Sequence, residues 1–508
     1  APALNSLSMS SEGDFIVGLV AMPGTDNQET ALAVWDIDGS IDVSKPLLPS
    51  RITPAGKMDF IGATAMSGGR LRVRAKQTWT GATRCIEGGG AGSVKTVIRK
   101  EFFGDKSINP KKLTDKFAGL GNSDAGGECP ANYSIVSQLP LEPDYVIART
   151  RTADGAGDYY KVNMKTEKKE FLFRDAGEVR VGYMNPRDGK PLSKQELQPI
   201  VGNDYEIRTY LLNAETGNFD LEEPLTYKAR ARERLTVEGR DEASGKFYIT
   251  TDKFTDKAAV YLYDAKTNEF SKEPLFAHPD FDAVDVVLGT KPHNFNKVLG
   301  FRYAGAAVET FWIDPEYKSI DDGLKAAFPG KLISYAGTNG NLSRVLFMTE
   351  SSDSPPAYYL LIDKSKVAVI GSSRPWMSNY KLGKTDLVYY TARDGLSIPA
   401  LLTPAAGWKQ GDSPRPAIVL PHGGPWARDF ADYDSSGWVQ FFATRGYHVI
   451  QPQYRGSSGW GKTIWFAGDN QWGMAMQDDK DDAAAWLVSE GYAKQDAIAI
   501  MGYSYGGF

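Results

Sequence analysis

The stretch that decides the fold is Gly502-Tyr503-Ser504-Tyr505-Gly506-Gly507, which directly follows the apolar run 497–501. This is the pattern G-x-S-x-G behind a buried strand, and it predicts a sharp strand-to-helix turn that lifts Ser504 above a sheet. Glycines at positions 502 and 506 leave room for neighbouring backbone at such a turn. A helix that begins here directs free N–H groups and its positive end toward a reacting carbonyl group. The pattern therefore singles out Ser504 as the candidate nucleophile.

Strands and helices alternate through the rest of the C-terminal segment, which we place at residues 381–508. The apolar run 417–420 is typical of a strand that is buried on both faces of a sheet. The order of elements is that of a parallel, doubly wound sheet. The expected elements are strands at 387–390, 398–402, 417–420, 447–450 and 497–501, and helices at 436–445 and 478–490.

A second motif, Pro421-His422-Gly423-Gly424-Pro425-Trp426, follows the strand at 417–420. In α/β-hydrolases a glycine-rich loop at this place offers a backbone N–H group to an oxyanion. The proposed oxyanion hole therefore pairs the N–H of Gly424 with the N–H of Tyr505. We expect His422 to shape the loop rather than to transfer a proton.

The first 380 residues contain an internal repeat. Each copy is a strand with aromatic or apolar residues that ends at an Asp or Asn, which starts a turn by bonding to nearby backbone. The steps between copies are 71, 54, 50, 51, 50 and 49 residues, and such a period predicts seven propeller blades over residues 1–380. The alternative is chance recurrence of a common turn in an irregular pair of β-sandwiches. The repeat positions are Asp38, Asn109, Asn163, Asn213, Asp264, Asp314 and Asp363.

The bulk composition narrows the function classes. A chain of 508 residues is too long for one ordinary core, so two or more domains are expected. With a net charge of −5 the chain has no electrostatic reason to bind nucleic acid or anionic lipid. No window holds the roughly 20 apolar residues of a membrane-spanning helix.

The two cysteines, Cys85 and Cys129, each lie beside a glycine-rich loop, which suits a disulfide bond. In the chain-entropy model this bridge contributes about 4 kcal/mol of stability. It would place the protein in an oxidising compartment, periplasmic or secreted, whereas two free thiols would suit the cytoplasm. Neither cysteine belongs to a C-x-x-C pair, so a zinc site is not expected. The acidic run 478–482 is explained by the dipole at a helix start, and we find no metal site or cofactor motif.

The motifs together resemble the acylaminoacyl-peptidase and dipeptidyl-peptidase branch of the prolyl oligopeptidase family. The resemblance implies a seven-bladed β-propeller followed by an α/β-hydrolase domain, here incomplete, and hydrolysis of short peptides through an acyl-enzyme. It also implies that the propeller limits substrate size. Ser504 matches the nucleophile of that family, and Gly424 and Tyr505 match the oxyanion donors. The runs that carry the resemblance are 421–429, 453–461, 471–473 and 502–507.

The catalytic base and its orienting acid are not found where the fold needs them. In this fold the chain order is Ser, then Asp or Glu, then His. Among the histidines, His278 and His293 fall in the propeller region, and His448 is expected in a buried strand. We therefore expect the protein to continue for roughly 130–180 residues beyond Phe508, on this chain or as a separate chain after cleavage, the alternative being an inactive fragment. Assembly into a homo-oligomer stays open.

Two side chains are weaker candidates for substrate contact. Arg428 follows the glycine loop and either binds a substrate terminus or, as we prefer, forms a loop-stabilising ion pair with Asp429. Tyr454 begins the next strand-to-helix loop and is expected to line the wall of the site. An esterase of the same fold and a catalytically dead binding scaffold are the alternatives to a peptidase. The residue preferred before the cleaved bond is not readable from the sequence, nor is the choice between exopeptidase and endopeptidase.

Overall fold

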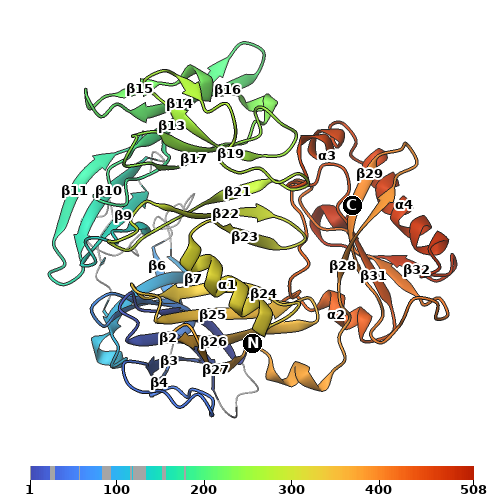
Figure 1. The fold of residues 1–508 in the computed structure, drawn as a ribbon, viewed down its shortest axis with the longest axis horizontal. Coiled ribbons are helices and arrows are strands. Elements are labelled where there is room, and N and C mark those ends of the chain that lie inside the picture. The colour runs from blue at the N-terminus through green and yellow to red at the C-terminus, as the bar shows by residue number, and fades with distance from the viewer. Residues whose placement is uncertain are drawn as a thin grey trace.

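The computed structural model describes residues 2–22, 24, 29–56, 58–82, 93–114, 117, 133–151, 156–176 and 179–508. Seven small antiparallel sheets follow one another around a central axis, and an α/β part packs against one side of them (Figure 1). Within each propeller sheet the strands pair in chain order, as expected for blades. The prediction of a seven-bladed propeller before an α/β-hydrolase domain is confirmed.

The first three blades contain eleven strands. They are β1 (Leu4–Met9), β2 (Phe15–Ala21), β3 (Thr30–Asp36) and β4 (Arg51–Pro54); β5 (Asp59–Met66), β6 (Arg70–Ala82) and β7 (Ser93–Asp105); and β8 (Tyr133–Gln138), β9 (Tyr145–Arg151), β10 (Gly157–Asn163) and β11 (Lys169–Arg174).

The other four blades complete the ring, and the sixth carries a helix after its third strand. They are β12 (Val179–Val181), β13 (Ser193–Ile200), β14 (Asp204–Leu212) and β15 (Phe219–Leu221), with β16 (Tyr227–Lys228) on β14; β17 (Leu235–Arg240), β18 (Phe247–Thr251), β19 (Ala259–Asp264) and β20 (Glu269–Phe270); β21 (Ala283–Leu288), β22 (Val298–Ala304) and β23 (Val308–Trp312), then α1 (Pro315–Ala327); and β24 (Leu332–Thr338), β25 (Arg344–Ser351), β26 (Ser354–Ile362) and β27 (Lys366–Ser372).

Every repeat position lies at the end of the third strand of its blade or shortly after it. The Asn163 side chain accepts the backbone N–H groups of Lys165 and Thr166, both at 2.9 Å. Asp314 makes the same kind of bond but caps α1, so a helix takes the place of an outer strand there. Five of the seven repeat positions cap their turn in this way, whereas Asp38 and Asp363 do not, so in most blades the period is that of a side-chain-capped turn.

The ring closes by packing between the first and last blades. The backbone N–H of Ala3 donates to the carbonyl of Ser373 at 2.7 Å. Leu4 and Ile16 of the first blade share one core cluster with Leu346 and Leu360 of the seventh. This continuous apolar contact fixes where the propeller ends and where the second domain begins.

The second domain is built on one five-stranded sheet. Its strand order is β28 (Asp386–Thr391), β29 (Ser397–Thr403), β31 (His448–Pro452), β30 (Ala417–Val419) and β32 (Ile498–Ile500). The three strands β31, β30 and β32 are parallel, as predicted, while β28 and β29 form an antiparallel hairpin. The predicted boundary between residues 380 and 381 falls in the link between β27 and β28.

Two helices cover opposite faces of this sheet. In α4 (Ala475–Ser489), Ala483 and Leu487 pack with Ala417 and Val419. In α2 (Trp438–Ala443), Val439 packs with Ile418, which lies between Ala417 and Val419 in β30 and therefore points to the other face of the sheet. A short helix, α3 (Lys462–Ala467), was not predicted, because six residues carry too little periodicity to mark it.

The hydrolase domain rests on the loops that join the second and third strands of blades five to seven. Lys462 donates to the carbonyl of Asp252 at 2.6 Å, and the N–H of Thr463 donates to Asp256 at 2.7 Å. In the seventh blade the carbonyl of Ser352 accepts from the Gln440 side chain at 2.8 Å. These contacts hold the hydrolase domain against one face of the propeller, at blades five to seven.

The opposite end of the axis opens into a cavity of about 800 Å³. The C-terminal ends of the innermost strands line it, and these ends point away from the loops that hold the hydrolase domain. They contribute Met9 of β1, Met66 of β5, Gln138 of β8, Leu288 of β21 and Thr338 of β24.

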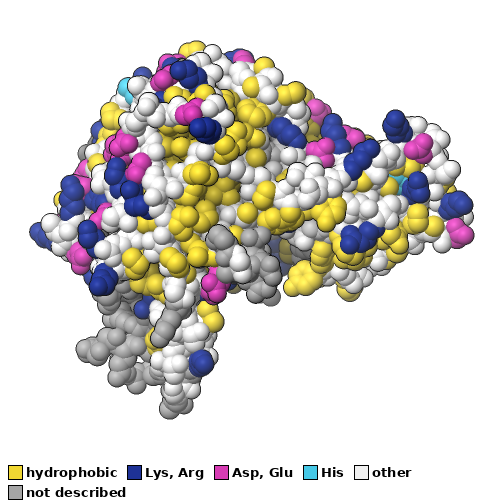
Figure 2. Space-filling model, turned by 90° about the horizontal axis from the view of Figure 1, so that it is seen from below, with side chains coloured by type: hydrophobic (Ala, Val, Ile, Leu, Met, Phe, Trp, Pro, Cys, Tyr) yellow, Lys and Arg dark blue, Asp and Glu magenta, His cyan; other side chains and the backbone are white. Residues whose placement is uncertain are grey.

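The surface carries both signs of charge. On the face in Figure 2, Lys and Arg side chains are interspersed with Asp and Glu, and a band of hydrophobic side chains crosses the propeller part. No helix in the described ranges combines the length and the hydropathy that a membrane crossing requires.

Candidate active site

Ser504 lies four residues beyond the last residue of β32 (Ile498–Ile500), at the first position of a short 3-10 turn (Ser504–Gly507). Its backbone has φ of 56°, in the left-handed region that non-glycine residues rarely occupy. A single residue in this region costs about 1–2 kcal/mol. The Ser504 side chain is exposed, so the turn presents its hydroxyl group to solvent and to a substrate.

The sharp turn at residues 502–506 is called the elbow here, and close packing requires its two glycines. A Cβ atom added at Gly502 would overlap the carbonyl oxygen of Gly506. A Cβ atom added at Gly506 would overlap the carbonyl oxygen of Pro421, at the start of the glycine loop. The G-x-S-x-G pattern therefore lets the nucleophile turn press directly against the proposed oxyanion loop.

The glycine loop faces the nucleophile. A Cβ atom built on Gly423 would lie 3.2 Å from the Cβ and 3.7 Å from the Oγ of Ser504. Within the described part of the chain, no group accepts a hydrogen bond from the backbone N–H of Gly424 or of Tyr505. The assignment of these two N–H groups as the oxyanion hole stays a prediction, and both donors are free to serve in it.

His422 packs inside the loop. Its Nε2 atom lies 2.9 Å from the Ser457 hydroxyl oxygen, and that hydroxyl donates to the carbonyl of Tyr454 at 2.6 Å. Burial lowers the pKa of His422 to about 4, so the imidazole is neutral at physiological pH. These contacts fasten the glycine loop to the segment that follows β31.

The structure corrects the role predicted for Tyr454. Its side chain is fully buried, so it does not line a surface that substrate can touch. Its hydroxyl donates to the carbonyl of His422 at 2.7 Å, and its ring stacks on the His422 ring at 4.6 Å. The sequence placed Tyr454 at the right loop, but the direction of the side chain depends on tertiary packing.

The predicted ion pair of Arg428 is wrong, because its guanidinium is already committed to backbone carbonyls of the propeller. It donates to Ala304 at 2.8 Å and to Gly305 at 2.6 Å, and it lies 4.0 Å from the centre of the Trp460 ring. Burial raises the pKa of the neighbouring Asp429 to about 6. Arg428 therefore ties the two domains together, and a contact with a substrate terminus would cost it these bonds.

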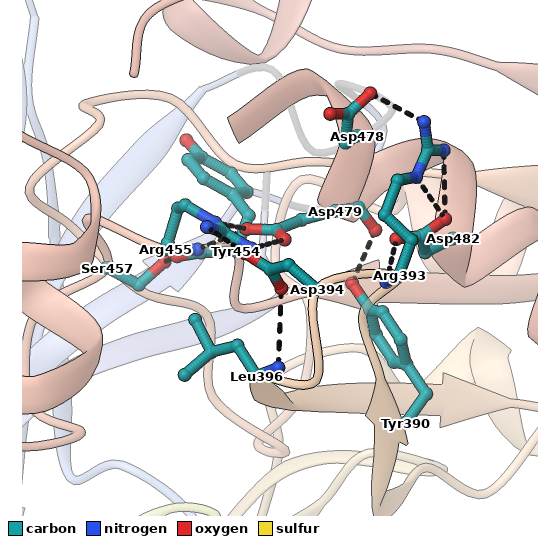
Figure 3. A network of polar contacts seen from close by, with 10 residues as sticks. All are labelled: Tyr390, Arg393, Asp394, Leu396, Tyr454, Arg455, Ser457, Asp478, Asp479 and Asp482. Carbon is teal, nitrogen blue, oxygen red and sulfur yellow. Dashed lines mark hydrogen bonds and ion pairs between the residues drawn. The ribbon is translucent and has the colours of Figure 1, made fainter. Parts of the chain in front are cut away.

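A polar network behind the site, shown in Figure 3, was not predicted from the sequence. Arg455, from the same loop as Tyr454, donates to Asp394 in the β28–β29 turn at 2.7 Å and to Asp479 in α4 at 2.8 Å. Asp479 is fully buried and also accepts the backbone N–H of Arg455 at 2.8 Å. The network joins three segments that lie far apart in the sequence.

The same network revises the reason given for the acidic run 478–482. The helix begins at Ala475, so within this run only Asp478 lies in the first turn, where the helix dipole favours a carboxylate. Arg393 also pairs with Asp478 and Asp482, at 2.8 and 2.9 Å (Figure 3). Arginine partners, rather than the helix dipole, therefore balance most of this charge.

Replacing Arg455 with methionine is expected to lower the free energy of unfolding of the hydrolase domain by about 3–5 kcal/mol, because Asp479 would be left buried and unpaired. Urea unfolding followed by tryptophan fluorescence measures the change. The double variant Arg455→Met with Asp479→Leu is the matched control and should recover much of the loss. Equal stability of Arg455→Met and the wild type would contradict this role.

The Asp394 carboxylate should make stability depend on pH. Hydrogen bonds from Arg455 lower its pKa from 3.8 to about 2. A carboxyl group whose pKa is lowered on folding stabilises the native state above its unfolded pKa, and this contribution is lost as pH falls toward the folded value. The melting temperature of the wild type should therefore exceed that of Asp394→Asn at neutral pH, and the gap should narrow progressively as pH falls from about 5 through the folded pKa of about 2. A gap that stays constant with pH would contradict the pairing.

Aromatic side chains form a wall next to Ser504. Trp426 and Trp472 are each more than half exposed, with ring centres 6.0 Å apart. Trp472 continues to Tyr505 at 5.2 Å, and Tyr505 to Phe508 at 5.7 Å. Such a wall suits the apolar side chain of a substrate. Only the tryptophans of the motifs 421–426 and 471–473 hinted at it in the sequence.

No histidine of the described residues contacts Ser504. His278 stacks on Tyr303 at 4.7 Å, and the Nδ1 atom of the buried His448 accepts the N–H of Ala405 at 3.0 Å. None of the four histidines, which all lie within residues 179–508, is therefore hydrogen-bonded to Ser504 as a proton acceptor. The predicted disulfide residues Cys85 and Cys129 lie outside the described residues.

A seven-bladed propeller joined to a parallel sheet with a strained serine elbow and a facing glycine loop defines the class of propeller-capped α/β-hydrolases. Residues 433–508 match the sequence model of Peptidase_S9, the prolyl oligopeptidase family. The match covers the last 76 of the chain's 508 residues, which are therefore similar to this family.

Two curated relatives illustrate the similarity. The chain is 28% identical over 385 residues to dipeptidyl aminopeptidase BIII of Pseudoxanthomonas mexicana. This alignment covers 74% of the chain and 53% of the relative. It is 34% identical over 222 residues to dipeptidyl peptidase family member 6 of Caenorhabditis elegans. This second alignment covers 40% of the chain and 29% of the relative. The chain thus spans about half the length of the first relative and less of the second.

Solved structures share the fold. Acylaminoacyl peptidase of Pyrococcus horikoshii superposes with a TM-score of 0.56 at 13% identity, and a puromycin hydrolase with 0.57 at 17% identity. Each match covers all of this chain and 74% of the other. At these identities the likeness establishes the fold alone.

Proposed function

We propose that the protein is a serine peptidase that hydrolyses short peptides through an acyl-enzyme on Ser504. The observation that carries this proposal is the exposed Ser504 hydroxyl, held in left-handed backbone against the Gly423–Gly424 loop. The family supports the peptidase class, and the relatives named above are dipeptidyl peptidases.

The reaction divides into two steps. The Ser504 oxygen bonds to the substrate carbonyl carbon while its proton passes to a base, and the N–H groups of Gly424 and Tyr505 bind the oxyanion. The C–N bond then breaks, and the base returns the proton to the leaving amine. Water attacks the ester by the same route, which releases the acid and restores the hydroxyl group.

We place the base and its orienting acid outside residues 1–508. The fold puts an Asp or Glu and then a His after the nucleophile in the chain. Either a continuation of this chain or a separate chain could supply them. The edge strand β32, whose Ile500 is 53% exposed, is where such a segment would extend the sheet.

The propeller is proposed to limit substrate size. It holds the hydrolase domain against the face of blades five to seven through the Lys462, Thr463 and Gln440 contacts, and this attachment supports the proposal that the propeller restricts access from that side. We expect oligopeptides to be cleaved and folded proteins to be spared. Periplasmic or secreted location remains a proposal that depends on a Cys85–Cys129 bridge, which thiol titration of the native protein would test.

A fluorophosphonate probe tests the proposal on the full-length protein. Labelling of Ser504 is the expected result, and it requires an activated hydroxyl. A protein that is not labelled would be a dead scaffold. Rates on a peptide anilide and on the matched ester then distinguish a peptidase from an esterase. Cleavage of the ester alone would make the protein an esterase.

A further inference from the structure

A buried lysine lies behind the candidate active site. Lys480, in α4, is 2% exposed although the lysine side chain is rarely buried. Its ammonium group makes no hydrogen bond or ion pair with the described residues. Burial lowers the pKa of Lys480, while the nearby Asp479 and Asp481 carboxylates favour the charged form. A buried charge without a direct partner is costly, so its surroundings need an explanation.

Two tyrosine rings surround the ammonium group. The Lys480 Nζ atom lies 5.0 Å from the centre of the Tyr454 ring and 4.9 Å from that of the Tyr505 ring. A cation in contact with the faces of two aromatic rings is stabilised most where water is excluded. The two rings are themselves 5.8 Å apart, and Met476 completes the cluster, with its sulfur accepting from the Tyr505 hydroxyl at 3.3 Å.

Each ring belongs to one half of the proposed oxyanion hole. Tyr505 carries one of the two N–H donors on its own backbone. Tyr454 binds the carbonyl of His422 at 2.7 Å and so holds the loop that carries the other donor, Gly424. Lys480 is therefore in contact with an aromatic ring of each half.

We propose that Lys480 is a positioning residue of the oxyanion hole, which binds the Tyr454 and Tyr505 rings together and so sets the distance between the two backbone donors. The proposal rests on the proposed peptidase function. Its consequence is kinetic: donors that are out of position stabilise the developing negative charge less in the transition state, while substrate binding is unaffected. A lysine that served only to fill the core would have no such effect.

The test compares Lys480→Met with Lys494→Met in the full-length protein. Methionine keeps the volume and removes the charge, and the exposed Lys494 is the matched control. For Lys480→Met we expect kcat to fall about 10- to 100-fold with KM changed less than twofold, and a thermal midpoint equal to or above that of the wild type. Lys494→Met should match the wild type in kcat, in KM and in thermal midpoint.

A transition-state analogue provides a second readout. A peptidyl trifluoromethyl ketone forms a tetrahedral adduct with the serine, and its Ki should rise in Lys480→Met by the factor by which kcat/KM falls. Unchanged kcat and Ki in Lys480→Met, or a fall in kcat matched by a lower thermal midpoint, would overturn the proposal for Lys480 alone. If the wild type is not labelled by a fluorophosphonate and cleaves no peptide, the proposed function fails, and the role of Lys480 with it.

Discussion

Ser504→Ala in the full-length protein is expected to lower kcat for peptide hydrolysis by about 10⁵- to 10⁶-fold, since the variant lacks the atom that would form the acyl-enzyme. Alanine keeps the Cβ atom and therefore the left-handed strain, so the loss reports the hydroxyl group itself. Steady-state rates on a peptide anilide, with covalent labelling by a fluorophosphonate, measure the effect. Labelling should disappear completely.

Ser504→Gly is the informative companion. It removes the hydroxyl group and also the strain of a non-glycine residue at φ of 56°. We expect it to be as inactive as Ser504→Ala and about 1 kcal/mol more stable than that variant. Activity within tenfold of the wild type in either variant would show that another residue is the nucleophile. Equal stability of the two variants would mean that the elbow is not strained.

Gly506→Ala is expected to produce the second largest effect. The new Cβ atom would overlap the Pro421 carbonyl oxygen, so the elbow and the glycine loop would have to move apart. We expect kcat to fall at least about 100-fold and the free energy of unfolding to fall by about 2–4 kcal/mol. Kinetics and urea unfolding on the same preparation measure both.

Gly507→Ala is the matched control for this prediction. It lies one residue further along, and its added Cβ atom would come no closer than 3.3 Å to any neighbour, the carbonyl oxygen of Gly502. We expect a stability change below about 1 kcal/mol and nearly normal kcat. If Gly507→Ala were as damaging as Gly506→Ala, close contact with Pro421 would not be the reason for the glycine at 506.

Local patterns were sufficient to predict the architecture. The seven repeat positions mark seven turns, and at five of them the Asp or Asn side chain binds backbone only two or three residues ahead, as Asn163 does. The elbow was predictable for the same reason: the requirement for glycine at 502 and 506 and for a serine between them is met within five residues. The short helix α3 and the switch from an outer strand to α1 were not predicted, since neither carries a long enough pattern.

The sequence by itself determined the propeller, the parallel sheet and the candidate nucleophile, because each depends on the order and spacing of neighbouring residues. Only the tertiary structure decided what surrounds that nucleophile. Arg428 holds propeller carbonyls, Tyr454 is buried beneath the glycine loop, and Arg455 reaches Asp394 and Asp479. These contacts join segments that are tens to hundreds of residues apart, so the direction of each side chain follows from the packing of whole elements rather than from its own neighbours in the chain.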